Sequence, residues 1–366
     1  MEGTPHIRMA GYDNARTTRL GPATFCALRG FGEANDCGLR RRERQYVEAN
    51  VGGLLPEYTG SGERMSSLRR LPRFEYLAPV SINEVCQLLA SHTSEAKLFA
   101  GGTDLILQMR RRETVPKYII GLKSVAELTF IREAHDGGLT IGAMTTLQTL
   151  LTSPIIRRTY GLLAEVAAGI GGPELRNVAT IGGNLAGALP CADFPPALIT
   201  LGATAKLSSS AGERTVPVED LFPSFGKTVA RADEFFTEIR LPSTPAFSGG
   251  AYLKFHDRQS MDMTTVGVSA FVTCDEDSRV FRDVKIALAS SAPVPIRVKK
   301  AETVLRGRGF AEDALEEAAL AVCEEADPRT SWRATREFRL DLLKGLTKRA
   351  IGRARENAAG STRDVS

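Results

Sequence analysis

The chain has 366 residues, of which 43% are hydrophobic and 25% charged, as in ordinary globular proteins. No run of 18 consecutive apolar residues occurs and no signal-peptide pattern opens the chain, so we expect neither a membrane span nor a signal peptide. The formal net charge of +4 resides in residues 1–73, which hold arginine but no lysine, while the remainder is neutral. Because no nucleic-acid-binding motif or aromatic interleaving accompanies these arginines, we expect no nucleic-acid partner.

Residues 1–70 differ from the rest because they are rich in Gly and Arg and lack sustained hydrophobic periodicity. We expect a poorly ordered extension. Three explanations stay open: a flexible partner-binding arm, a targeting extension, and upstream sequence that the natural protein does not use. We favour a nonessential extension.

Regular patterning begins at Leu71 and predicts alternating strands and helices as far as residue 244. Ser81 is a candidate N-cap with Glu84 three residues later, as in a capping box, and Thr145 or Thr146 should lie near the cap of a later helix. A β-hairpin is expected around Ala211–Gly212. The other expected elements lie in residues 74–77, 96–102, 105–111, 117–122, 138–153, 160–172 and 233–242. The alternation indicates an α/β or α+β class.

A second unit begins near Pro245 and is expected over residues 245–356. Three strands come first and could form an antiparallel sheet; they lie in residues 250–256, 264–276 and 281–293. Three helices follow, in residues 297–307, 313–326 and 331–356. Strands followed by helices favour an α+β layer separate from the first domain. Residues 357–366 should form a frayed tail.

Six cysteines are scattered along the chain, at Cys26, Cys37, Cys86, Cys191, Cys274 and Cys323. None forms a CxxC pair, and their spacing fits neither a zinc site nor an iron–sulfur cluster. We therefore expect free thiols in a reducing, cytoplasmic environment.

The stretch FAGGTDLILQMR, from Phe99 to Arg110, joins an expected strand to an expected helix through two glycines. Gly101 and Gly102 leave room for backbone N–H groups to approach a ligand, and Thr103 adds a hydroxyl donor. Successive N–H groups in such a turn can bind an anion such as a pyrophosphate. Taken alone, however, the pattern more often marks a plain strand–turn–helix connection.

A second glycine segment, Ile181–Asn184, follows Thr180 and repeats the arrangement. Two glycine turns could clamp one diphosphate from both sides, and the carboxylate of Asp193 could accept hydrogen bonds from ribose hydroxyls. Neither GxGxxG nor GxxxxGK[ST] occurs, so the Rossmann and P-loop interpretations both fail.

The pair AGGTDL and ATIGGNL…DFPPALITLGA resembles the FAD-binding, medium subunit of molybdenum hydroxylases. That family includes carbon monoxide dehydrogenase flavoproteins and the FAD domain of xanthine dehydrogenase. The resemblance covers roughly residues 71–354 and extends to GGPELRNVATIGGN, LFPSFGKT, IRLP and YLKFHDRQSMDMTTVGVSA. In LFPSFGKT, Phe-Gly stands where many relatives carry an Arg-type residue.

The resemblance implies an α+β chain. A two-subdomain FAD-binding fold of the vanillyl-alcohol oxidase type would span residues 71–244, with subdomains at about 71–127 and 128–244. A small C-terminal domain would follow, with a three-stranded antiparallel sheet and helices.

The resemblance also implies which residues hold FAD. Leu98 to Leu105 should wrap the diphosphate, Thr180 to Asn184 should supply a second clamp, and Asp193 should contact the adenosine ribose. Ile170 falls where a residue packs near the cofactor. Lys254 should lie near the isoalloxazine ring, where a cation stabilises the reduced flavin. The full set is Leu98, Phe99, Ala100, Gly101, Gly102, Thr103, Asp104, Leu105, Ile170, Thr180, Ile181, Gly182, Gly183, Asn184, Asp193 and Lys254.

Two further charged residues of the matching segments could have purely structural roles. Arg176 could be a structural salt-bridge partner, and Asp262 could hold the domain interface. The thiol of Cys191 more readily indicates packing than chemistry.

The resemblance implies an oxidoreductase subunit without a catalytic acid or base of its own. Electrons would pass from [2Fe–2S] clusters on a small partner subunit to FAD, and then to NAD, a quinone or oxygen. A large subunit with a molybdenum cofactor would hydroxylate the substrate, and the complex would be a dimer of heterotrimers. The alternatives are a self-contained flavoprotein oxidase or reductase of the same fold, and a scaffold protein that lost its cofactor.

Overall fold

The computed structural model describes residues 70–258, 261–277 and 280–360. The expected N-terminal extension, apart from Arg70, and the last six residues lie outside this part. The described residues from Leu71 onwards belong to one compact unit.

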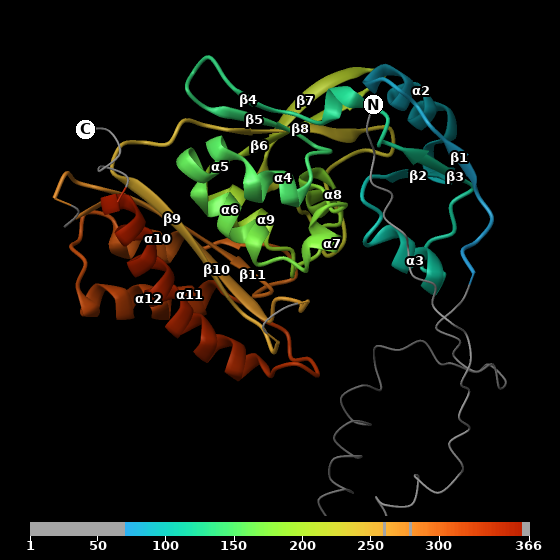
Figure 1. Cartoon of the computed structure of the whole chain (residues 1–366). Coiled ribbons are helices and arrows are strands. Elements are labelled where there is room, and N and C mark those ends of the chain that lie inside the picture. The colour runs from blue at the N-terminus through green and yellow to red at the C-terminus, as the bar shows by residue number, and fades with distance from the viewer. Residues whose placement is uncertain (1–69, 259–260, 278–279, 361–366) are drawn as a thin grey trace, which may run out of the picture. The chain divides into compact units, whose positions relative to one another are not determined.

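The first subdomain is a small parallel sheet with two helices (Figure 1). Its elements are β1 (Glu75–Leu77), α2 (Ile82–His92), β2 (Ala96–Phe99), α3 (Leu105–Arg111) and β3 (Tyr118–Gly121). The strand order is β1-β3-β2. The expected cap is confirmed, because the Ser81 side chain accepts a hydrogen bond from the Glu84 N–H, and the Glu84 carboxylate accepts one from the Val80 N–H.

The second subdomain contains an antiparallel sheet of five strands in the order β4-β5-β8-β6-β7. The strands are β4 (Ile131–Glu133), β5 (Leu139–Gly142), β6 (Thr204–Ser209), β7 (Gly212–Pro217) and β8 (Phe235–Leu241). The β6–β7 pair is the expected hairpin, with Ser209 opposite Gly212.

Six short helices connect β5 to β6 and lie between the five-stranded sheet and the C-terminal sheet (Figure 1). They are α4 (Leu147–Thr152), α5 (Pro154–Thr159), α6 (Gly161–Ala168), α7 (Pro173–Arg176), α8 (Ile181–Ala186) and α9 (Phe194–Thr200). Thr146 caps α4 by accepting a hydrogen bond from the Thr149 N–H. Short 3-10 turns lie at Thr93–Glu95 in the first subdomain, at Ala126–Leu128 before β4, and at Val218–Asp220 after β7.

The C-terminal part has four antiparallel strands in the order β12-β11-β10-β9. The strands are β9 (Ser248–Phe255), β10 (Val266–Cys274), β11 (Phe281–Ala289) and β12 (Ile296–Arg297), and the helices are α10 (Lys299–Leu305), α11 (Glu312–Glu325) and α12 (Arg336–Gly360). The three expected strands form, and β12 adds a fourth edge strand of two residues. Helix α12 continues through Gly360, so the first four residues of the expected tail are helical.

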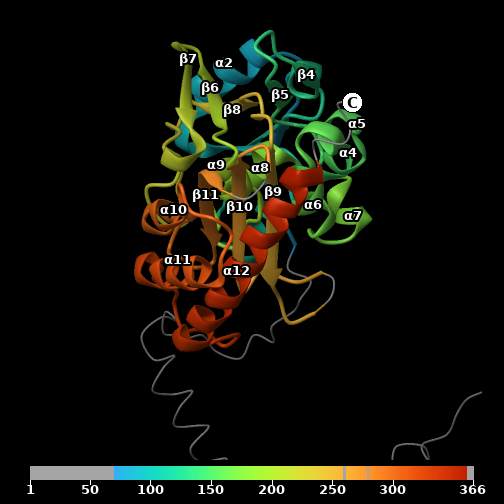
Figure 2. The same ribbon diagram turned by 90° about the vertical axis from the view of Figure 1, so that its left-hand side faces the viewer.

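The C-terminal sheet is covered on both faces. Helix α12 crosses β9 and β10 on one face (Figure 2), while α6 and α9 pack on the other. Tyr252, Phe271 and Ala287 of this sheet therefore belong to the same buried cluster as α6 and α9. The C-terminal sheet therefore buries its second face against the FAD-binding part.

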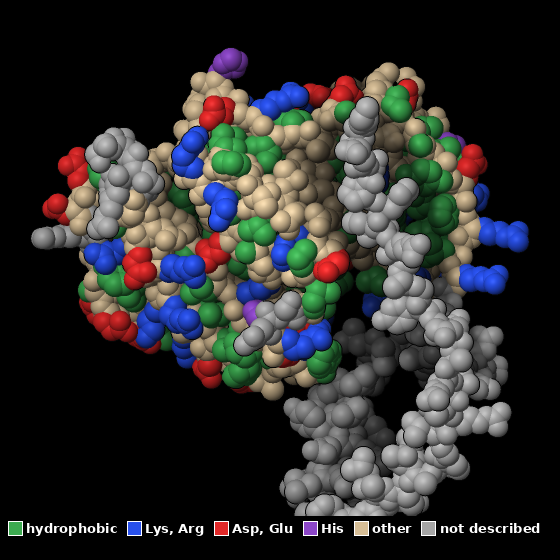
Figure 3. Space-filling view, in the orientation of Figure 1, with side chains coloured by type: hydrophobic (Ala, Val, Ile, Leu, Met, Phe, Trp, Pro, Cys, Tyr) green, Lys and Arg blue, Asp and Glu red, His purple; other side chains and the backbone are tan. Residues whose placement is uncertain are grey.

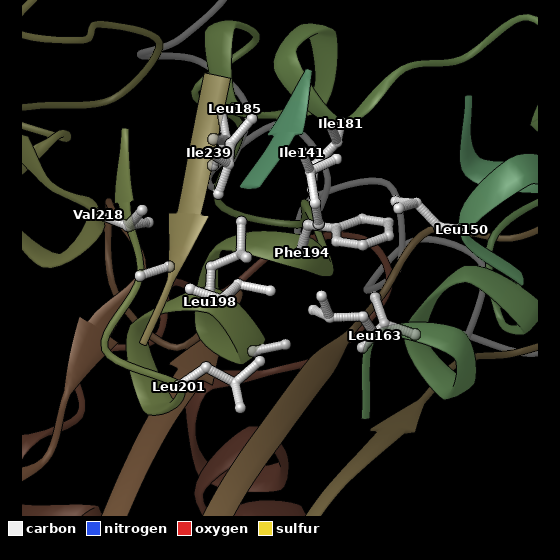
Figure 4. Packing of buried hydrophobic residues seen from close by; sticks show 14 of the residues in the cluster. Ile141, Leu150, Leu163, Ile181, Leu185, Phe194, Leu198, Leu201, Val218 and Ile239 are labelled. Atoms are coloured by element: carbon white, nitrogen blue, oxygen red, sulfur yellow. The ribbon is translucent and has the colours of Figure 1, made fainter. Parts of the chain in front are cut away.

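The centre of that cluster is Phe194, which is fully buried between β5, β8 and the helices (Figure 4). Burying a side chain of this size stabilises the fold by about 1.5–3 kcal/mol. Because Asp193 directly precedes Phe194, the packing of α9 also fixes the position of that carboxylate.

The visible surface over the C-terminal helices carries interspersed acidic and basic side chains (Figure 3). Lys348 of α12, for example, bonds Glu312 and Glu316 of α11. This mixture agrees with the neutral charge of the main body and shows no basic stripe on that face. In the part of the chain that the structure describes, no helix is long and apolar enough to span a membrane.

Candidate functional site

The first glycine segment forms the loop between β2 and α3. Gly102 has a φ of +71°, and a Cβ there would lie 2.5 Å from the Phe99 ring, so glycine is required. The backbone N–H groups of Gly101, Gly102 and Thr103, and the Thr103 hydroxyl, donate to no other described residue. The loop therefore presents free donors, as an anion site requires.

The second glycine segment differs from expectation, because it is the first turn of α8 and not a free turn. Thr180 is the N-cap, and its hydroxyl accepts a hydrogen bond from the Gly183 N–H at 3.0 Å. The Ile181 and Gly182 N–H groups donate to the carbonyls of Thr145 and Ala143. What this segment leaves unpaired is the Asn184 side-chain oxygen, which is buried without a partner among the described residues.

The two glycine segments, far apart in sequence, meet in space. A Cβ on Gly101 would lie 2.0 Å from the Val178 carbonyl oxygen, and one on Gly183 would lie 3.7 Å from the Ala100 Cβ. Gly101 is thus required because the two backbones touch. The structure brings residues 98–105 and 180–184 together into one site.

Asp193 is only 5% exposed and is held by the C-terminal part. One carboxylate oxygen accepts the Tyr252 hydroxyl at 2.6 Å and the Thr264 hydroxyl at 2.5 Å, and the other accepts the Lys254 ammonium at 2.6 Å. A carboxylate offers about four acceptor sites, so three are already used. One acceptor site on the Asp193 carboxylate therefore remains unused by the described residues.

Tyr252 and Thr264 hold Asp193 but are not among the cofactor-binding residues predicted from the sequence. Tyr252 shares a face of β9 with Lys254 because the two are separated by one residue, and this i, i+2 spacing was a usable signal. Burial, reinforced by the Asp193 charge, raises the pKa of Tyr252 well above its usual 10. The phenol therefore stays protonated and donates to Asp193.

Ile170 lies in the loop after α6, and Arg176 holds that loop. The Arg176 Nη1 donates to the carbonyls of Ile170 and Gly171 at 3.1 Å each, and Nε donates to Gln148 at 3.2 Å. The interpretation of Arg176 as a salt-bridge partner is wrong, because its partners among the described residues are neutral oxygens.

Asp262 binds within its own loop and not across the domain interface. Its carboxylate accepts hydrogen bonds from the N–H groups of Arg258 and Met263, both at 2.9 Å. Within the described ranges, no group of three or more His, Cys, Asp or Glu side chains is arranged to hold a metal ion.

Comparison with known proteins decides the family. Residues 72–244 match the family of the FAD binding domain in molybdopterin dehydrogenase, and residues 251–354 match the CO dehydrogenase flavoprotein C-terminal domain. The chain is 34% identical to the putative xanthine dehydrogenase FAD-binding subunit of Escherichia coli (strain K12), over 78% of this chain and 97% of that protein. It belongs to the FAD-binding subunits of molybdenum hydroxylases.

Other members of this family agree. The carbon monoxide dehydrogenase medium chain of Hydrogenophaga pseudoflava is 35% identical, over 77% of this chain and 97% of that protein. A solved carbon monoxide dehydrogenase from the same organism, lacking the Mo-pyranopterin moiety, superposes with a TM-score of 0.76 at 34% identity, covering 79% of this chain and 99% of that chain.

The expected family, the α+β architecture and the FAD cofactor are therefore confirmed. The chain is a subunit of an oxidoreductase, and an electron-transfer role fits a molybdenum hydroxylase FAD-binding subunit.

Proposed function

We propose that the diphosphate of FAD lies against Gly101–Asp104, with Thr180–Asn184 as the facing wall. The N–H groups of Gly101, Gly102 and Thr103 carry this proposal, because these three consecutive donors before α3 have no acceptor among the described residues. The neighbouring residues of β2 and α3 keep this loop in place.

The buried Asn184 oxygen also fits FAD. An unpaired buried carbonyl oxygen costs about 1–3 kcal/mol, and a hydroxyl of the ligand would remove that cost. The same wall offers the Asn184 amide N–H groups as donors. The site thus holds donors for phosphate and an acceptor for a sugar-like hydroxyl.

We place the isoalloxazine ring between Ile170 and Lys254. Bound FAD would supply temporary storage for two electrons. The Lys254 ammonium donates one hydrogen bond to Asp193, which leaves two N–H groups to stabilise negative charge on the reduced ring. Asp193 fixes the direction of that ammonium, and because of this short ion pair we assign its carboxylate to the flavin end of FAD and not to the adenosine ribose.

The complex that we propose contains this chain, a large molybdenum-cofactor subunit and a small [2Fe–2S] subunit, as a dimer of heterotrimers. Electrons would enter from the small subunit and leave to NAD, a quinone or oxygen. We propose a cytoplasmic location, in keeping with the free thiols of Cys86, Cys191, Cys274 and Cys323.

Isolation of the native complex through a tag on this chain tests the proposal. We expect stoichiometric FAD, together with molybdenum and iron in two partner chains. A preparation that carries FAD and turns over substrate without partners would contradict it in favour of a self-contained flavoprotein. A preparation without FAD would contradict the assignment of the site.

A further inference from the structure

A cavity of about 290 Å³ is lined by Leu189–Cys191 on one side and by residues of the C-terminal part on the other. Phe225 and Met263 supply apolar walls, and three arginines, Arg329, Arg333 and Arg339, line the same space. These arginines belong to the segment that leads from α11 into α12 and to the first turn of α12. No role of the proposed FAD site uses them.

Arg339 is a buried cation that is not fully paired. Arg339 is 4% exposed, and one guanidinium nitrogen donates to the Thr265 carbonyl and another to the Ser331 hydroxyl. Its Nε has no partner within the described ranges. The Nε of Arg333 is also buried without a partner among the described residues. Unpaired donors of this kind cost free energy that a bound acceptor would recover.

The side chains that line the cavity carry more positive than negative charge, although the carboxylate of Asp257 also acts on Arg339. Arg329 makes no hydrogen bond or ion pair to another described residue, while Asp327 also lines the cavity and interacts with Arg336 at 3.7 Å. Burial, followed by the neighbouring guanidinium groups of Arg329 and Arg333, lowers the pKa of Arg339. The cavity wall therefore holds three guanidinium groups and one carboxylate.

The cavity is adjacent to the residues proposed for the flavin. Thr264 lines it and donates to Asp193, which in turn binds Lys254. A ligand in the cavity would thus be separated from the Lys254 pair by one side chain. The volume of the cavity lies just below the ~300–1,000 Å³ of pockets for drug-sized ligands. A cavity of this size fits one ring system with an acidic substituent.

We infer that this cavity binds an anionic, ring-bearing ligand, with Arg329 and Arg333 recognising its charge and Phe225 and Met263 contacting its ring. That the ligand is the electron acceptor rests on the proposed function. Arg339 is the positioning residue, because it ties the segment carrying the other two arginines to Thr265. An acidic acceptor is accordingly preferred over a neutral one of the same shape.

Binding of anthraquinone sulfonate to the full chain tests this inference, with uncharged hydroxymethylanthraquinone as the matched probe. Trp332, the single tryptophan, is 84% exposed and lies 4.3 Å under the Arg333 guanidinium, so quenching of its fluorescence reports binding. The sulfonate should bind about tenfold more tightly than the neutral probe, as one charge-assisted hydrogen bond supplies. Added salt should reduce this preference.

The variant Arg329→Gln should remove most of the preference for the sulfonate, because it removes a guanidinium charge that recognises the anion. Arg329 is exposed, so we expect the variant to keep its fold. Arg306→Gln is the matched control, since it removes an exposed guanidinium that pairs with Asp283 away from the cavity. Equal affinity for both probes, or an equal effect of the two variants, would overturn the inference.

FAD content measured on the same preparations separates the two proposals. Chains that bind FAD without any charge preference would refute the cavity assignment alone. Chains that prefer the sulfonate but hold no FAD would support the cavity and refute the flavin site.

Discussion

The substitution Gly101→Ala tests whether contact between the two glycine segments builds the FAD site. A methyl group there would lie 2.0 Å from the Val178 carbonyl oxygen, whereas ordinary contact begins at 3.4 Å. The segments would have to separate by about 1.4 Å along that line, and neither backbone can rotate away as a side chain can. Overpacking of this kind costs typically about 1–3 kcal/mol.

We expect FAD affinity to fall at least about tenfold, and the melting temperature of the FAD-free chain to drop by a few degrees. Titration with FAD and thermal unfolding measure the two effects. Gly345→Ala is the control, because a Cβ at this position inside α12 meets nothing within 4 Å and alanine favours the helix. A Gly101→Ala chain with full FAD and an unchanged melting temperature would refute the reasoning.

Variants of Asp193, Arg176 and Glu234 probe polar groups that are buried or half-buried. Asp193→Asn leaves Lys254 without a counter-charge and should lower the free energy of unfolding in urea by about 3–5 kcal/mol. The double variant with Lys254→Met should recover part of this loss, and no recovery would exclude the ion pair as its cause. Arg176→Ala frees the carbonyls of the loop after α6 and should cost about 1–3 kcal/mol and weaken FAD binding; an unchanged FAD affinity would show that this loop needs no such support. The hydrogen bond from Arg214 lowers the pKa of Glu234 in the folded protein. The ionised Glu234 carboxylate therefore stabilises the fold above pH ~4.3, the usual pKa of a glutamate, and this stabilisation is lost as the pH falls through the folded-state pKa. Glu234→Gln should flatten the acid side of a stability–pH curve, and a curve as steep as that of the unchanged chain would contradict this assignment.

Local features of the fold were predictable because they depend on neighbours in sequence. The Ser81 cap, the Thr146 cap and the β6–β7 hairpin each follow from residues within a few positions of one another. The three strands from β9 to β11 were predictable for the same reason, since each contains aromatic or β-branched residues that favour strands.

The contacts that require a particular residue at each position of the site were harder to predict. Gly101 was attributed to the approach of a ligand, but the atom that excludes a side chain belongs to Val178. The partners of Asp193 lie 59–71 positions away, on β9 and in the loop before β10, and no local pattern shows that they converge on Asp193. The family resemblance identified Gly101, Asp193 and Lys254, but it did not identify Tyr252 or Thr264 or reveal which side chains hold one another.

The sheet shared between the two parts limits how this protein can be divided. A fragment of residues 72–244 would leave the apolar faces of α6 and α9 in water, and a fragment of residues 251–354 would expose one face of β9–β11. Each fragment would aggregate or unfold, although each corresponds to a separate family match. Engineering that exchanges the C-terminal part between relatives must therefore exchange the matching surface of α6 and α9 as well.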